Sequence, residues 1–208
     1  KVYVNTYIRN YPEPNPERAE HAGALFKKHL DNLIAEPEYR DILLDYMAHM
    51  VQRPGVKIRW AVLLQGAEGC GKTFLAEAMK AVLGQGHVRP VDPEALRGQW
   101  NDWAYGAQLV VLEEVRVAGQ NRHEVMNALK PLISNELINI NQRFRDSRNV
   151  ANTANYLLFT NHHDALTLND TDRRYFVVES AMQTKAQVKA LGGPAYFVPL
   201  FNMLRDDA

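Results

Sequence analysis

The segment from residue 66 to residue 73 places three glycines directly before a lysine and a threonine. Its sequence, GAEGCGKT, fits the pattern G-x-x-x-x-G-K-T. Glycines permit the positive φ angles that aim successive backbone N–H groups at one anion. In such a turn Lys72 reaches the β- and γ-phosphates of a nucleotide, and the Thr73 hydroxyl holds Mg²⁺. The spacing therefore predicts a site for ATP and Mg²⁺.

The segments around this turn support that interpretation. Residues 60–65, WAVLLQ, form a short apolar run rich in strand-forming residues, and residues 72–83 carry apolar side chains at helical spacing before Gly84. The turn thus joins a buried strand to a helix, whose N-terminus adds partial positive charge. A surface loop that matches the pattern by chance is the alternative, and this context argues against it.

Two further apolar runs end in polar side chains. Glu113 and Glu114 follow residues 109–112, and Asn161 follows residues 155–160. Ligands of open α/β sheets bind at the carboxyl ends of the strands. We expect Glu113 to bind Mg²⁺, Glu114 to polarise the attacking water, and Asn161 to hold that water or sense the γ-phosphate. Solvated carboxylates and a turn-forming asparagine are the simpler interpretations of each feature taken alone.

Arg173 and Arg174 precede the apolar run 175–178. Guanidinium groups stabilise the charge on a phosphoryl group during its transfer. The sequence leaves open whether these arginines act on their own nucleotide or on that of a neighbouring subunit. Two surface arginines at the start of a strand are the alternative.

A basic segment with an aromatic residue lies between two predicted strands, at residues 141–149. A hairpin tip of this composition suits contact with a nucleic-acid backbone and stacking on a base. A solvated charged hairpin is an equally good interpretation of this segment alone. The residues in question are Arg143, Phe144, Arg145 and Arg148.

The composition of the chain limits the classes of protein and of binding site that it can form. The chain has 208 residues, 46% of them hydrophobic, and a formal net charge of zero, so any nucleic-acid site must be a local patch. Cys70 is the only cysteine, which precludes an intrachain disulfide. We expect it to be a small loop residue rather than a nucleophile, because no partner base is placed beside it in the sequence. Neither a signal peptide nor a membrane-spanning run is visible, so the sequence predicts a cytoplasmic protein without a membrane partner. Because it begins with Lys1, we expect a piece of a longer polypeptide.

Strands alternate with helices along most of the chain, which predicts an α/β fold with a mostly parallel sheet and helices on both faces. Two amphipathic stretches, 16–34 and 37–51, precede the first strand and predict a small helical subdomain. The predicted division is a helical lead-in at 1–54, a P-loop ATPase core at 55–182 and a helical tail at 183–208.

The order of the motifs resembles the superfamily 3 helicases, AAA+ ATPases of small viruses, phages and plasmids. It is most similar to the phage and plasmid primase-helicases, over about residues 38–180. The elements that carry the resemblance are the glycine turn, the strand-end acidic pair, the segment LKPLISNELININQRFR, the strand-end asparagine and the arginines before a strand. One departure is the Glu113–Glu114 pair, because AAA+ motors more often carry Asp-Glu there.

The resemblance implies a role for each motif. Glu113 and Glu114 correspond to Walker B, and Asn161 to the sensor. The segment that begins at about Lys130 includes the DNA-binding hairpin, and Arg173 or, preferably, Arg174 is the finger that acts on a neighbour. The ATP contacts would come from the Walker A residues and the residue after them: Gly66, Ala67, Glu68, Gly69, Cys70, Gly71, Lys72, Thr73 and Phe74.

The resemblance also implies partners. Subunits of this family form homo-oligomeric rings, commonly hexamers, that bind single-stranded DNA, and a primase or polymerase is fused to them or works with them.

Three rival functions are open. One is another P-loop DNA motor, such as a packaging ATPase or an initiator loader, and a second is a weakly hydrolysing, nucleotide-gated scaffold module. The third is a small-molecule kinase, which the lack of a lid or acceptor-pocket signature disfavours.

Overall fold

The computed structural model describes residues 15–113, 121–162 and 172–205. Its centre is a parallel sheet in which the strands lie in the order β2-β3-β6-β1-β7. The sheet confirms the predicted α/β fold with a mostly parallel sheet. Its strands are β1 (Ala61–Gln65), β2 (Val88–Val91), β3 (Leu109–Leu112), β6 (Asn155–Thr160) and β7 (Tyr175–Glu179).

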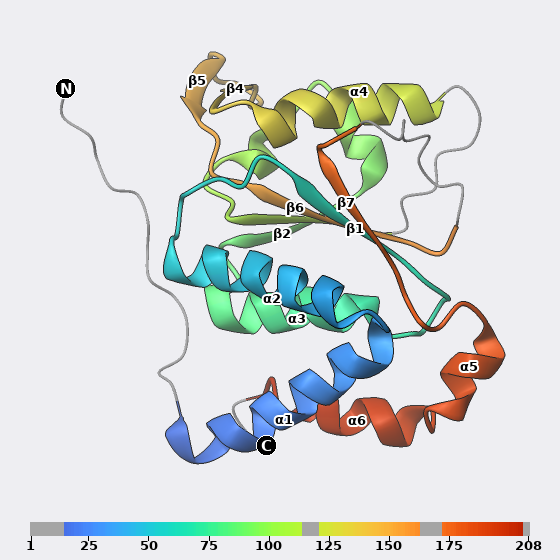
Figure 1. The fold of residues 1–208 in the computed structure, drawn as a ribbon. Coiled ribbons are helices and arrows are strands. Elements are labelled where there is room, and N and C mark those ends of the chain that lie inside the picture. Colours follow the sequence, from blue (N-terminus) through green and yellow to red (C-terminus); the bar gives the residue numbers. More distant parts are fainter. Residues whose placement is uncertain (1–14, 114–120, 163–171, 206–208) are drawn as a thin grey trace.

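Helices cover both faces of this sheet (Figure 1). One face carries α1 (Pro16–Leu33), α2 (Pro37–Gln52) and α3 (Lys72–Leu83). The other carries α4 (Asn121–Ser134) and the 3₁₀ helix η1 (Pro93–Arg97). Because both faces are covered, β1, β3 and β6 are buried along their whole length, as their near-continuous apolar sequences predict.

Alternate residues of β1 serve two separate cores. Val62 and Leu64 pack with side chains of α1, α2 and α3, whereas Ala61 and Leu63 pack with those of α4. The two N-terminal helices therefore share a core with the sheet. The predicted domain boundaries at residues 54 and 182 stay predictions.

Local signals explain where several helices begin and end. The Asn15 side chain caps α1 by accepting a hydrogen bond from the Glu17 amide. Gly84, with φ of 87°, follows the last residue of α3. A proline does not end α4, which continues past Pro131 to Ser134. Near the end of this helix, the Asn152 side chain donates to the carbonyls of Leu132 and Asn135.

The remaining elements lie at the two ends of the sheet (Figure 1). An antiparallel hairpin, β4 (Leu137–Ile140) with β5 (Arg148–Ala151), leads into the amino end of β6. The 3₁₀ helix η2 (Asp102–Ala104) packs beside it, since Ala104 shares a small core with Ile138 and Ile140. After β7 the chain forms α5 (Lys185–Ala190) and α6 (Pro194–Asn202). Within the described ranges, none of the helices is long and apolar enough to cross a bilayer.

Candidate nucleotide site and hairpin surface

The glycine turn between β1 and α3 has a backbone that only glycine suits. Gly69 and Gly71 have φ angles of 79° and 95°. A β-carbon on Gly66 would lie 2.5 Å from the Ser180 β-carbon, and one on Gly71 would lie 2.4 Å from Cε1 of His29. All three glycines are therefore required, two of them by conformation and two by close approach.

Several backbone N–H groups of this turn are open to a ligand. In the described part of the chain, the amides of Gly66, Ala67 and Cys70 donate to backbone carbonyls, which belong to Thr160, Met182 and Ala67 respectively. The first amides of a helix have no partner inside the helix, so α3 contributes further donors. Among the described residues, no backbone carbonyl outside α3 accepts from the amides of Glu68, Gly69, Gly71, Lys72 and Thr73. Such an array fits an anion with several oxygens.

Lys72 is the buried charged residue at the end of the glycine turn. It is only 7% exposed, and its ammonium donates to the carbonyls of Gly66 (2.7 Å) and Ala67 (2.9 Å) and to Oδ1 of Asn161 (2.9 Å). These acceptors are all neutral. Because a buried cation is costly without a counter-charge, this position favours an anionic ligand.

A cavity of about 280 Å³ lies against the turn. As predicted, the carboxyl ends of β3 and β6 bring Glu113 and Asn161 to it, together with Lys72 and Thr73. The side chains of Glu113 and Thr73 are exposed and offer the oxygen ligands that Mg²⁺ prefers. The polar lining thus fits a triphosphate with its metal ion. Glu114 lies outside the described residues.

Part of the lining of this cavity is aromatic, and two of its aromatic residues come from α6. Phe197 and Phe201 line it, and Phe201 packs edge-to-face on Phe74 with ring centroids 5.5 Å apart. Sequence reasoning missed this aromatic lining and treated the tail only as a helical segment. The recurrence of phenylalanine at four-residue spacing, at 197 and 201, is the signal that could have indicated it.

A histidine of α1 joins the turn to α6. His29 is completely buried, with Nε2 3.1 Å from the Gly71 carbonyl and Nδ1 3.0 Å from the Tyr196 hydroxyl. Burial lowers the pKa of His29, and the weaker effect of the Gly71 carbonyl opposes that shift. The ring is therefore neutral near pH 7. Nothing in the local sequence marked this residue.

Two other residues after β7 contact the turn. The Ala67 amide donates to the Met182 carbonyl (2.8 Å), and Lys185 of α5 forms an ion pair with Glu68 (3.0 Å). Cys70 is fully buried, 3.6 Å from the Lys72 ammonium through its Sγ, in accord with the prediction of a small loop residue. The segment after β7 thus supports the glycine turn from one side.

The two predicted finger arginines lie at the opposite edge of the sheet. Both precede the amino end of β7, whereas the glycine turn follows the carboxyl end of β1, and these two strands are parallel neighbours. Arg174 donates to Asp172 (3.1 Å) and to the Ser134 hydroxyl (3.1 Å). Arg173 is exposed. The fold therefore keeps both arginines away from the cavity of their own subunit.

The hairpin tip is exposed, as predicted. Arg143 and Arg145 extend into solvent, and Phe144 is fully exposed with a φ of 61°. Arg148 instead lies at the base of the hairpin, with its guanidinium 4.6 Å from the centre of the Tyr105 ring. Lys130, on α4, donates to the Asn127 side chain.

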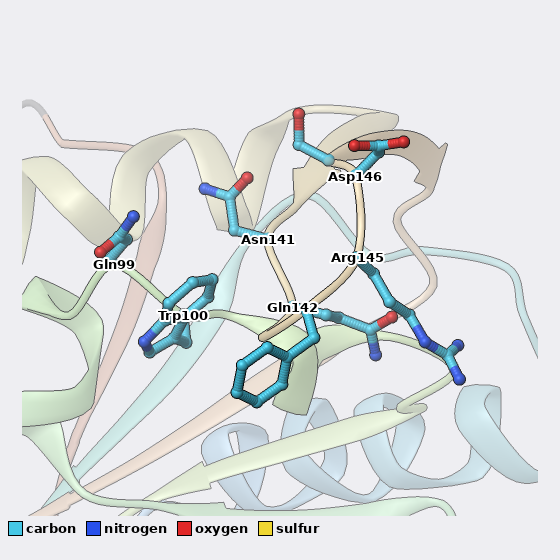
Figure 2. Close-up of a pocket in the computed structure, with 8 residues that line it drawn as sticks. Gln99, Trp100, Asn141, Gln142, Arg145 and Asp146 are labelled. Carbon is cyan, nitrogen blue, oxygen red and sulfur yellow. The ribbon is translucent and has the colours of Figure 1, made fainter.

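Two hollows of about 690 and 640 Å³ flank the tip. Trp100 lines both of them, from the loop between η1 and η2, and is 36% exposed. Figure 2 shows its indole near Asn141 of the hairpin. Trp103 lines the second hollow with Arg143, and its buried indole N–H has no hydrogen-bond partner in the described residues. Sequence reasoning missed both tryptophans, because only the tertiary structure places them beside the tip.

Comparisons with known proteins agree with this architecture. The chain is 26% identical to the DNA primase-polymerase of Nitratiruptor phage NrS-1, over 89% of this chain and 29% of that protein. The apo structure of the C-terminal region of NrS-1 (residues 305–718 there) superposes with a TM-score of 0.69 at 22% identity, covering 92% of this chain and 46% of the other. This chain thus spans less than half the length of either of these NrS-1 chains.

The structure of a JCV helicase, solved with a bound thiazolopyridine acetamide compound, shares the fold as well. It superposes with a TM-score of 0.54 at 15% identity, covering 91% of this chain and 60% of the other. At these identities the likeness concerns the fold alone. Residues 64–174, more than half of the chain, match the family of unknown function DUF5906. The match begins just before the glycine turn and ends at Arg174. This chain therefore belongs to the DUF5906 family.

Proposed function

We propose that this chain is the ATP-driven motor of a phage or plasmid replication protein, of the superfamily 3 AAA+ helicase type. It hydrolyses ATP at the interfaces of a homo-oligomeric ring, a hexamer by resemblance, and moves along single-stranded DNA. One observation carries the proposal: a cavity lined by a buried lysine and other polar side chains lies at the carboxyl edge of the sheet, and a basic, aromatic hairpin lies at the amino edge.

Within the cavity, each described residue has a role that its position supports. Lys72 exchanges its carbonyl acceptors for phosphate oxygens, since an anion compensates its buried charge better than neutral groups do. Thr73 and Glu113 would hold Mg²⁺, and the bound ion would offset the negative charge of the phosphates. Asn161, freed from Lys72, orients the attacking water. The role of accepting the proton of that water goes to Glu114 from the sequence alone, since this residue lies outside the described ranges.

The position of the arginines supports hydrolysis between subunits. Their edge of the sheet is opposite to the cavity of the same chain, so a guanidinium can reach a γ-phosphate only from a neighbour. We assign this role to Arg173, because Arg174 is already bonded to Asp172 and Ser134. A subunit on its own is then a poor ATPase.

The hairpin surface supports binding of single strands. Arg143 and Arg145 can contact phosphates, and the exposed faces of Trp100 and Phe144 offer stacking surfaces for unpaired bases. Because such contacts read the backbone and the flat faces of bases, binding is largely independent of sequence.

The NrS-1 relative favours a second candidate. That protein is a DNA primase-polymerase, and this chain corresponds to 29% of it. A nucleotide-gated module that assembles with a primase or polymerase and turns over slowly would use the same cavity. A packaging ATPase or an initiator loader would also share it, but unwinding of a tailed duplex would separate the helicase from both.

We expect the ATPase rate per subunit to rise steeply with protein concentration and to rise further with single-stranded DNA. The reason is that both the finger and the ring require a neighbour. Phosphate release at a series of protein concentrations, with and without an oligonucleotide, measures this. A rate per subunit that is independent of concentration and of DNA would refute the motor and favour the slowly hydrolysing module.

Replacement of both Arg143 and Arg145 by alanine is expected to weaken DNA binding and to lower its salt dependence. Each lost phosphate contact lowers the slope of log affinity against log salt by about 0.7, so the pair lowers it by about 1.4. Fluorescence anisotropy with an oligonucleotide at several salt concentrations measures the slope. The matched control is Lys27→Ala with Lys28→Ala on α1, which removes the same charge far from the hairpin (Figure 1).

The aromatic residues should behave differently in the same assay. Trp100→Ala or Phe144→Ala is expected to weaken binding by about 5- to 150-fold per stacked base while leaving the salt slope unchanged. Trp100→Phe and Phe144→Tyr keep an aromatic face and should restore most of the affinity. Unchanged binding in the alanine variants would place the DNA elsewhere on the chain.

A further inference from the structure

The contacts of His29 are specific enough to fix its proton. The Gly71 carbonyl can only accept a hydrogen bond, so Nε2 of His29 carries the hydrogen and donates it. Nδ1 is therefore the bare nitrogen, and the Tyr196 hydroxyl donates to it. The same hydroxyl oxygen accepts a hydrogen bond from Nδ2 of Asn32. The hydrogen bonds thus run in one direction, from Asn32 of α1 to Tyr196 of α6, then to His29 of α1 and from it to Gly71 of the glycine turn.

Of the two groups bonded to the His29 ring, Gly71 lines the candidate nucleotide site and Tyr196 is next to a residue that lines it. Gly71 is the residue before Lys72 and has the left-handed conformation that begins α3. Tyr196 belongs to α6, whose neighbouring Phe197 lines the cavity and would lie 3.0 Å from a β-carbon on Gly71. His29 therefore contacts the phosphate end of the site and the helix that supplies part of its aromatic lining.

We propose that His29 is a positioning residue that couples the docking of α6 to the conformation of Gly71, so that nucleotide binding and α6 docking favour each other. This proposal rests on the proposed nucleotide site. Its physical basis is that both nitrogens of the neutral ring are used. Loss of either bond leaves a buried polar group without a partner and breaks the link between Gly71 and Tyr196.

Substitutions can separate the two halves of the link. Glutamine at position 29 retains a donor at the place of Nε2 and loses the acceptor for Tyr196. Asparagine retains an acceptor at the place of Nδ1 and loses the donor to Gly71. Tyr196→Phe removes only the hydroxyl. His49→Gln is the matched control, because Nε2 of His49 also lies 3.1 Å from a carbonyl, that of Val56, but His49 does not line the cavity.

The experiment measures binding of the non-hydrolysable analogue AMP-PNP by calorimetry and amide exchange of residues 194–202 by mass spectrometry. We expect the analogue to slow exchange in α6 of the wild-type chain. His29→Gln and Tyr196→Phe should each remove that protection and weaken binding by about 3- to 10-fold, the range for one lost hydrogen bond. The double variant should be no worse than Tyr196→Phe alone, because that substitution already removes the bond to His29 together with the bond from Asn32.

His29→Asn should weaken binding while retaining the bond to Tyr196, and His49→Gln should leave both measurements unchanged. If the wild-type chain binds AMP-PNP but the position 29 and 196 variants bind it equally well, the coupling is refuted even where their melting temperatures fall. If the wild-type chain does not bind AMP-PNP at all, the proposed nucleotide site itself is wrong. The two failures are therefore distinguishable.

Discussion

Lys72→Met is expected to lower the ATPase rate by about 10²- to 10³-fold, the typical cost of losing one preorganised group that stabilises transition-state charge. Methionine keeps the aliphatic stem and removes only the ammonium. That ammonium is the buried cation of the glycine turn and contacts Asn161, so its loss removes both a charge and a fixed contact to the sensor position. Phosphate release at saturating ATP, with single-stranded DNA present, measures the effect.

The matched control for this substitution is Lys80→Met in the same helix. Lys80 pairs with Glu77 at 3.5 Å on a partly exposed face, and such surface pairs contribute about 0–1 kcal/mol. Its removal should leave the rate within about twofold of the wild type, since it lies outside the cavity. A Lys72→Met chain that folds and still hydrolyses ATP at the wild-type rate would show that the catalytic cavity is elsewhere.

The second large effect is expected for Arg173→Ala, which should reduce the ATPase rate by about 10³-fold or more, the scale of an arginine finger. The decisive test mixes two inactive chains. Arg173→Ala retains an intact cavity, and Lys72→Met retains an intact arginine. In a ring, some interfaces join the intact cavity of one chain to the intact arginine of the other, so activity should return.

The extent of recovery is predictable. In randomly mixed rings about one interface in four combines an intact cavity with an intact arginine, so the mixture should reach up to about a quarter of the wild-type rate. Arg174→Ala, mixed in the same way, decides between the two arginines. If Arg174→Ala is complemented and Arg173→Ala is already active alone, then Arg174 is the finger and its bonds to Asp172 and Ser134 must break on assembly.

The mixing experiment can also contradict the role of the arginines between subunits. Failure of every mixture, with both parent chains folded by circular dichroism, would mean that the arginines do not act between subunits. Because the fold places them at the amino edge of the sheet, they could not then act in their own cavity either. The hydrolysis mechanism would have to use another cation.

The short-range features of this protein follow from the sequence alone. The glycine turn, its flanking strand and helix, and the alternation of exposed and buried residues in β4 are all encoded within about a dozen residues. The convergence of Glu113 and Asn161 on Lys72 was also predictable, because parallel strands that end in polar residues meet at one edge of the sheet.

Only the tertiary structure decided which distant residues complete the candidate nucleotide site and the hairpin surface. His29 and Gly71 are 42 residues apart, and His29 and Tyr196 are 167 apart, with no periodic pattern to connect them. The position of Trp100 beside the hairpin tip also depends on the tertiary structure. So does the position of Arg173 and Arg174 away from the cavity of their own subunit. Sequence periodicity indicates which face of an element is buried, but the packing of whole helices and strands determines which residues meet there.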